Sequence, residues 1–236
     1  MPIARLLLPS FLLVLSACAG RGPAATPVAA APGASPDTAL GPPDHPRVAH
    51  LKHALRGLRY DSGRVEVDAA TAAEVIRLAD ADDANEAFAR GVALLRRNRR
   101  VGAIEALTLC VILAPERAEH YAALGRALFA KGLSAEAAAA FRSALDRAPN
   151  RVETRFRLGM VLQAGGDFAA AVVAWRDVLR LDPEHVGARI RVAIASYYLE
   201  DYASAWEFTH SVEALGESVP PQFRELLAAQ MSEPAE

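Results

Sequence analysis

Residues of the same type recur at one constant interval along most of this chain, which limits the folds open to it. Small residues recur at this interval at Gly91, Gly125, Gly159 and Ala193. Three further columns hold alanines, mostly bulky residues and prolines: Ala103, Ala137, Ala171 and Ala205; Leu107, Phe141, Trp175 and Thr209; Pro115, Pro149 and Pro183. Because the phase holds over four units, the chain is expected to stack one supersecondary unit repeatedly.

Each unit has the pattern of two amphipathic helices joined by a short turn. In the clearest unit, residues 118–151, apolar side chains at i, i+4 and i+7 predict helices over about Glu119–Ala130 and Ser134–Arg147. Gly132 is expected to end the first helix, because glycine adopts positive φ at little cost. Ser134 is the predicted N-cap of the second helix.

A helix–turn–helix of this length with residues in this order resembles the tetratricopeptide repeat, W-x2-L-G-x2-Y…A-x3-F…P. The resemblance is strongest at Leu124-Gly125, with Tyr121 in place of the Trp and Leu128 in place of the later Tyr. It covers about Asp83–Gly216. It implies an all-α fold, a solenoid of antiparallel helix pairs with four repeats over residues 84–216.

The segments on either side of the repeats are expected to close the solenoid. Residues 44–83 are predicted to be helical, either as a degenerate leading repeat or as an unrelated N-terminal helical cap, since Gly57 stands one repeat length before Gly91. Residues 217–236 are predicted to hold a C-terminal capping helix, Pro221–Met231, and a fraying tail, Ser232–Glu236. The expected inner stripe of that helix is Phe223, Leu226, Leu227 and Met231.

The N-terminus has the pattern of a bacterial lipoprotein signal peptide over residues 1–17. The apolar run Leu6–Leu15 is too short to cross about 30 Å of hydrocarbon as a helix. It ends in Leu15-Ser16-Ala17-Cys18, which resembles a lipobox, and the resemblance implies that Cys18 is lipidated. The alternative is ordinary cleavage nearby, which would leave Cys18 unmodified or remove it.

Residues 18–43 are predicted to be a disordered tether, because they are rich in alanine and proline and lack periodicity. Ala19 follows the cysteine, where an aspartate would favour the inner membrane in the Gram-negative sorting pattern. The resemblance therefore implies a lipid-anchored protein of the bacterial cell envelope, at the outer membrane and facing the periplasm.

No catalytic or metal-binding motif emerges, so the sequence predicts neither an enzyme nor a cofactor or metal site. The motifs GxxxxGK[ST], GxGxxG after a strand, HExxH, CxxC and GxSxG are all missing. Cys110 is interpreted as a small core residue. The basic cluster Arg96–Arg100 is interpreted as a solvated turn, and without a basic stripe carrying stacking aromatics no nucleic-acid partner is expected.

The expected working surface is the concave one, which first helices line in this family. Projecting the family geometry onto this chain places eleven residues there: Phe88, Val92, Leu95, Arg126, Phe129, Phe156, Met160, Gln163, Ile190, Ile194 and Tyr197. A mostly apolar groove of this kind suits an extended or helical peptide. Phe88 and Val92 stand where a clamp for a C-terminal carboxylate would begin, so that chaperone-docking role is not expected. The alternative is that the fold buries these residues.

The resulting functional hypothesis is a membrane-anchored scaffold that binds proteins or peptides at the cell envelope. Its plan is similar to repeat-bearing lipoproteins that assist type IV or tight-adherence pilus assembly, and to those that organise cell-wall or outer-membrane biogenesis. The alternative is a structural envelope module that acts by edge contacts or self-association, without a peptide groove. Oligomeric state is left open by the sequence.

Overall fold

The computed structural model describes residues 55–60, 63–78 and 83–234, all within the compact unit Ala39–Glu236. These residues form two short strands and ten helices. The strands are β1 (Leu58–Arg59) and β2 (Glu66–Val67). The helices are α3 (Ala69–Leu78), α4 (Ala84–Arg96), α5 (Arg100–Leu113), α6 (Ala118–Lys131), α7 (Ser134–Arg147), α8 (Val152–Ala164), α9 (Phe168–Leu181), α10 (Val186–Tyr198), α11 (Tyr202–Glu213) and α12 (Pro221–Gln230).

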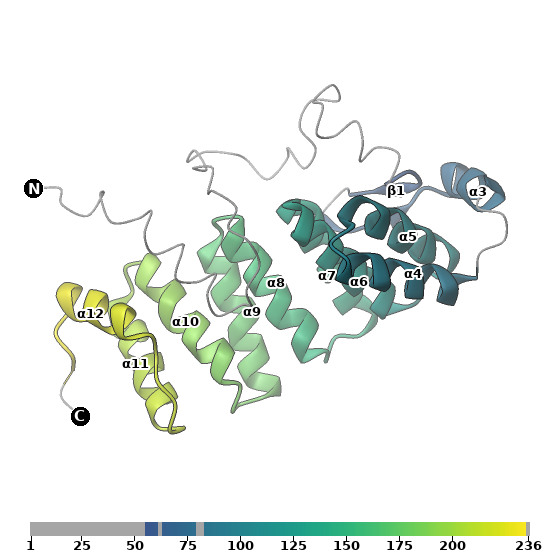
Figure 1. Cartoon of the computed structure of the whole chain (residues 1–236). Coiled ribbons are helices and arrows are strands. Elements are labelled where there is room, and N and C mark those ends of the chain that lie inside the picture. Colours follow the sequence, from purple (N-terminus) through teal and green to yellow (C-terminus); the bar gives the residue numbers. More distant parts are fainter. Residues whose placement is uncertain (1–54, 61–62, 79–82, 235–236) are drawn as a thin grey trace, which may run out of the picture. The chain divides into compact units, whose positions relative to one another are not determined.

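Helices α4 to α11 form four consecutive antiparallel pairs, which confirms the predicted all-α solenoid. The partners within a pair pack against each other, and the second helix of each pair packs against the first helix of the next. Figure 1 shows the pairs following one another in chain order. A single pair cannot bury both of its apolar faces, so the stacking of neighbours supplies much of the core.

The turn inside each pair holds one residue in the left-handed region. These residues recur once per repeat, at Asn98, Gly132, Gly166 and Glu200, with φ of 58°, 88°, 86° and 61°. Glycine adopts this conformation freely and asparagine tolerates it, whereas Glu200 adopts it at some cost. The prediction that Gly132 ends its helix with positive φ is confirmed.

The predicted N-cap at Ser134 is wrong. Ser134 is the first helical residue of α7, and Leu133 occupies the cap position without a side-chain hydrogen bond. In the next two repeats the cap position is polar: Asp167 accepts from the Ala170 amide at 2.9 Å, and Asp201 accepts from the Ser204 amide at 3.1 Å. The repeat therefore keeps its geometry whether or not this cap is present.

The glycine column and the bulky column face each other within the pairs. A Cβ atom added to Gly91 would lie 2.6 Å from Leu107, one on Gly125 3.1 Å from Phe141, and one on Gly159 2.4 Å from Trp175. In the fourth pair, where alanine replaces the glycine, the bulky position holds the smaller Thr209, which is fully buried. The two columns therefore compensate for each other in size along the repeats.

The described residues before α4 correct the prediction of a helical segment. Leu58–Arg59 pairs antiparallel with Glu66–Val67, and α3 is the one helix found in the described part of residues 44–83. Gly57 lies in the glycine column of the repeats, but its φ of 92° is incompatible with a helix. The expected first helix of a leading repeat is therefore wrong over residues 55–60.

This N-terminal segment packs on the second helices of the first two repeats. The Val65 amide donates to Ser143 Oγ at 2.9 Å, and Arg64 forms an ion pair with Asp146 at 2.6 Å; both partners lie on α7. Leu58 and Val65 are buried in the same hydrophobic cluster as residues of α5 and α7. The segment thus shares the hydrophobic core of the first two repeats on the side of their second helices.

The C-terminal helix α12 packs on the last pair as predicted, but its predicted inner stripe and the predicted fraying of the tail need correction. Phe223 and Leu227 are fully buried, whereas Leu226 is half-buried. Met231 lies beyond the helix with its side chain exposed, and its carbonyl accepts a hydrogen bond from Trp206 Nε1 at 3.1 Å. The tail was expected to fray from Ser232, but Glu233 is held by hydrogen bonds to α11 and α12.

The predicted signal peptide, Cys18 and the tether lie outside the described residues. Among the helices that the structure describes, none combines the length and the apolar character needed to cross a membrane.

Candidate functional site

The eleven predicted groove residues lie on the first helices α4, α6, α8 and α10, at positions that recur once per repeat. We call this set the first-helix surface. It has three rows: Phe88, Phe156 and Ile190; Val92, Arg126, Met160 and Ile194; Leu95, Phe129, Gln163 and Tyr197. All of them are half-buried except Ile194, which is 1% exposed. The surface is therefore partly accessible at every predicted position but that one.

Two phenylalanines of this surface each contact a histidine ring. The ring of Phe88 lies 5.4 Å from that of His120, and the ring of Phe156 lies 4.8 Å from that of His185. His120 is buried, and its Nδ1 lies 2.9 Å from the Cys110 carbonyl oxygen. These contacts orient the two phenylalanine rings, which both remain half-buried.

Arg126 lies at the middle of the surface and is half-buried. Burial lowers the pKa of its guanidinium, and the nearby positive charges of Arg157 and Arg96 lower it further, while Glu153 opposes them. Arg157 is already paired with Glu153 at 2.5 Å. Arg126 itself forms no hydrogen bond or ion pair with any residue that the structure describes.

Sequence reasoning missed that Arg96 and Arg157 form a positive cluster with Arg126 on this surface. Arg96 ends α4, Arg157 lies on α8, and both act on the Arg126 guanidinium. Arg191 lies on α10, one repeat length after Arg157. Arg191 donates to Gln163 Oε1 at 3.2 Å. The repeat spacing was the signal that could have identified Arg157 and Arg191.

The C-terminal end of the surface is an aromatic cluster that covers part of it. The ring of Tyr197 lies 5.7 Å from those of Tyr198 and Tyr202, and 6.0 Å from that of Phe223 on α12. Desolvation raises the pKa of Tyr197 and Tyr198, so both phenols stay neutral at physiological pH. The surface is therefore more open over α4, α6 and α8 than at α10.

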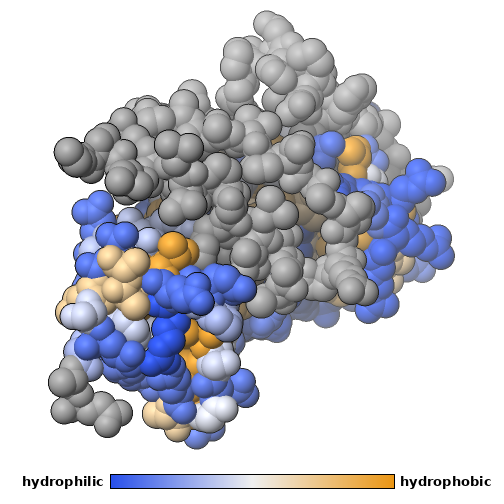
Figure 2. Space-filling model, turned by 60° about the vertical axis from the view of Figure 1, so that its left-hand side comes forward, coloured by the Kyte–Doolittle hydropathy of each residue, from blue (hydrophilic) through white to orange (hydrophobic). Residues whose placement is uncertain are grey.

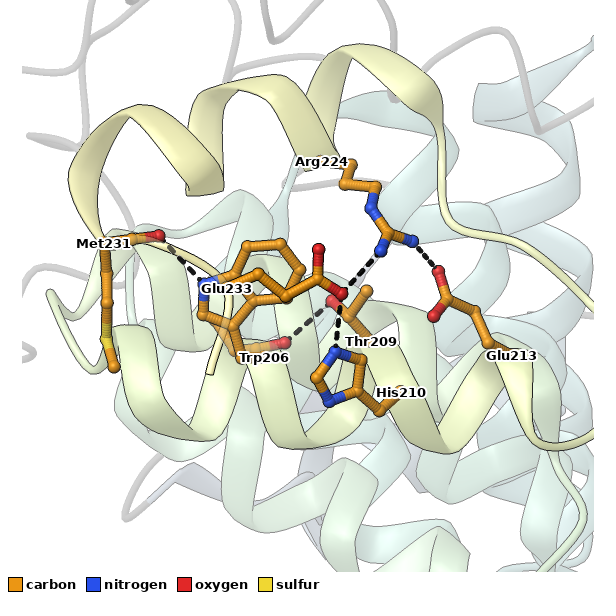
Figure 3. A network of polar contacts seen from close by, with 8 residues as sticks. Trp206, Thr209, His210, Glu213, Arg224, Met231 and Glu233 are labelled. Carbon is orange, nitrogen blue, oxygen red and sulfur yellow. Dashed lines mark hydrogen bonds and ion pairs between the residues drawn. The ribbon is translucent and has the colours of Figure 1, made fainter. Parts of the chain in front are cut away.

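A polar network fastens the C-terminal tail to α11, as Figure 3 shows. Glu233 Oε1 lies 3.0 Å from His210 Nε2 and 2.6 Å from Arg224 Nη2. Arg224 also pairs with Glu213 at the end of α11. These contacts join the tail, α12 and the last repeat, so α12 is held by more than its two buried apolar side chains.

The described residues contain no group of three or more metal-ligating side chains. Cys110 is fully buried, its thiol donates to the Leu107 carbonyl at 3.2 Å, and burial raises its pKa to about 12. A thiol of this kind is a poor nucleophile at neutral pH.

Other exposed apolar side chains are scattered. The large ones among the described residues are Ile76, Val173, Leu181, Leu199, Leu215 and Met231. In Figure 2 the described part of the visible surface is mostly hydrophilic, and its hydrophobic residues show as small separate areas. These residues therefore do not suggest a second interaction surface.

Two segments of the chain match models of the tetratricopeptide repeat, residues 118–151 and 153–185. The chain contains tetratricopeptide repeats. The matched segments are the pairs α6/α7 and α8/α9, and the pairs α4/α5 and α10/α11 extend the same antiparallel stacking.

Solved structures of tetratricopeptide-repeat proteins share this fold. A crystal structure of MamA is 20% identical, with a TM-score of 0.56, over 64% of this chain and 87% of that one. MamA residues 41 to the end from Desulfovibrio magneticus RS-1 are 17% identical, with a TM-score of 0.55, over 72% and 94%. YrrB, described as a TPR protein with an unusual peptide-binding site, is 20% identical, with a TM-score of 0.54, over 70% and 81%. No curated protein sequence matches this chain significantly.

Proposed function

We propose that this chain is a scaffold of the bacterial cell envelope that binds partner polypeptides on its first-helix surface. In this proposal a lipid on Cys18 anchors the protein, at the outer membrane and facing the periplasm. Its tetratricopeptide repeats and its structural neighbours support a role in protein–protein interaction. Proteins built from such repeats are generally scaffolds without catalytic activity. Assembly of a pilus or secretion machine, or envelope biogenesis, is the proposed setting.

One observation carries the binding role: large apolar side chains recur, half-exposed, at equivalent positions of successive first helices. Phe129 and Met160 are the most central of them, on α6 and α8. Each also packs on a buried cluster, Phe129 on that of the first repeats and Met160 on that of the third and fourth. Aromatic and methionine side chains anchored in this way are typical of peptide-binding grooves. The peptide-binding site of YrrB offers a precedent on the same fold.

The binding role can be tested with a displayed library of random peptides and the full-length chain. We expect Phe129→Glu and Met160→Glu to abolish capture of the peptides that the wild type selects. Val173→Glu is the matched control, since Val173 is apolar and 61% exposed but lies on the second helix α9. Far-UV circular dichroism confirms that each variant is folded. Equal capture by all variants would contradict the proposal and favour the alternative of edge contacts.

The anchor can be tested separately by Cys18→Ala and labelling with radioactive palmitate. We expect the wild type to incorporate label and to fractionate with membranes, and the variant to do neither. Cys110→Ala is the control, because the buried thiol of Cys110 should contribute to neither readout. Membrane fractionation unchanged by Cys18→Ala would contradict lipid anchoring and leave the peptide-binding role standing.

A further inference from the structure

Arg126 differs from the other half-buried arginines of the first helices in having no acceptor among the residues that the structure describes. Arg155 on α8 donates to Asp177 at 2.9 Å and to the Pro149 carbonyl at 2.6 Å. Arg189 on α10 donates to the Pro183 carbonyl at 2.6 Å. Arg126, on α6 between them and α4, makes no such contact with any described residue. Its guanidinium has lost part of its hydration without gaining a partner in the described part of the chain.

The surroundings of Arg126 add to this cost. Arg96 and Arg157 are close enough to depress its pKa, and Glu153, whose charge opposes them, is engaged by Arg157 at 2.5 Å. A partly desolvated cation among like charges is unfavourable until an anion joins it. An anion placed here would therefore gain both the attraction of the cluster and the relief of its internal repulsion.

Apolar side chains flank Arg126 on the same surface. Phe129 lies one helical turn further along α6, and Met160 occupies the equivalent position to Arg126 in the next first helix. A ligand that spans them needs an anionic group with apolar groups beside it. Free phosphate or a nucleic-acid backbone has the anion but lacks the apolar neighbours, whereas an acidic peptide has both.

We propose that Arg126 binds the side-chain carboxylate of an Asp or Glu in the partner peptide, whose neighbouring apolar residues pack on Phe129 and Met160. Arginine suits this role because its planar fork can donate two parallel hydrogen bonds to one carboxylate. Arg96 and Arg157 raise the local positive potential and speed association. The inference rests on the proposed function and specifies the chemistry of its ligand.

The test uses synthetic, C-terminally amidated copies of the peptides that the library selects, with a fluorescent label and the full-length chain. Amidation removes the terminal carboxylate, so any acid preference comes from side chains. We expect the selected peptides to be enriched in Asp and Glu, and replacement of one acid by its amide to weaken wild-type binding about tenfold, or about 1.4 kcal/mol. Arg126→Gln should weaken the acidic peptide similarly and should make acid and amide peptides bind equally. Arg126→Glu should reverse the preference toward a Lys-containing peptide.

Arg142→Gln is the matched control. Arg142 is also half-buried, burial also lowers its pKa, and no bond to a described residue satisfies it, but it lies on the second helix α7. Arg142→Gln should leave the affinity for the acidic peptide unchanged. Peptides that bind with no acid preference, or with equal affinity for wild type and Arg126→Gln, overturn this inference alone. A library that yields no binding peptide overturns the proposed function with it.

Discussion

Gly159 lies so close to Trp175 that no side chain fits between them. A Cβ atom on Gly159 would lie 2.4 Å from Trp175 Nε1, which donates to the Phe156 carbonyl at 3.1 Å. The indole is fully buried and held by this hydrogen bond, so it has little freedom to move aside. This contact explains why the column that defines the repeat holds glycine opposite the bulkiest side chain.

We therefore expect Gly159→Ala to lower the free energy of unfolding by about 2 kcal/mol, through overpacking of the third pair. Gly165→Ala is the control, because its Cβ would meet its nearest neighbour at 3.4 Å and its φ is −80°. That change should shift stability by about 0.5 kcal/mol or less. Urea denaturation followed by circular dichroism measures both, and equal midpoints would contradict the packing argument.

The N-terminal segment depends on a second close approach. Gly57 has a φ of 92°, and a Cβ on it would lie 2.9 Å from Ile112 Cδ1 on α5. Gly57→Ala should therefore detach the strands from α5 and α7 while the four helix pairs stay folded. Hydrogen exchange at the Val65 amide, which donates to Ser143 Oγ, should speed up at least tenfold, or about 1.4 kcal/mol.

Gly63→Ala is the control for that experiment. Gly63 also has positive φ, at 69°, but the nearest neighbour of its Cβ is the end of a flexible arginine side chain at 3.2 Å. Gly63→Ala should disturb the local turn, but it should speed hydrogen exchange at the Val65 amide less than Gly57→Ala does. Unchanged exchange at Val65 in Gly57→Ala would mean that the strands do not depend on this contact.

A comparison of Gly57 with the glycines of the repeats shows how far the repeat spacing predicts the fold. Where a whole unit matches, as at residues 118–151, the predicted second helix Ser134–Arg147 agrees with α7. Gly57 falls in the same column as Gly91, yet it lies in a left-handed turn before a strand. A glycine at this position thus predicts a helix pair only when the other residues of the repeat are present, because the close contact between the two helices is what makes glycine necessary there.

The candidate site could be predicted in part for a similar reason. The spacing places the eleven residues on first helices, but it does not predict which of them other parts of the chain cover. Ile194 is fully buried, and Tyr197 contacts Phe223 of α12, a helix outside the repeat pattern. The sequence also could not predict that Arg126 has no acceptor among the described residues, because this depends on where the neighbouring helices place their side chains.

Cys110 offers a simple check of the core of the first pair. Its thiol is fully buried and its pKa is raised to about 12, so almost none of it is thiolate at neutral pH. In a Cys18→Ala chain, N-ethylmaleimide should leave Cys110 unmodified over hours at neutral pH and label it fully in concentrated guanidinium. Mass spectrometry reads the outcome, and rapid labelling without denaturant would show that α5 is less well packed than described.

The fastening of the tail should depend on pH. The hydrogen bond with His210, followed by that with Arg224, holds the pKa of Glu233 below its ordinary value of 4.5. A carboxylate with a lowered pKa stabilises the folded state above its unfolded value, and this contribution is lost as the pH falls through the folded pKa. The tail should therefore stay fastened above pH 4.5 and loosen below it.

Trp206 provides the probe for this change, because its Nε1 donates to the carbonyl of Met231, two residues before Glu233. Above pH 4.5, Glu233→Gln should speed exchange of the Trp206 indole proton relative to wild type, measured by nuclear magnetic resonance. The difference should vanish as the pH falls through the lowered pKa of Glu233, since both tails then lack the carboxylate. Glu225→Gln, an exposed change on α12, should match wild type at every pH. A difference between Glu233→Gln and wild type that persists unchanged into strong acid would show that the charge of Glu233 does not hold the tail.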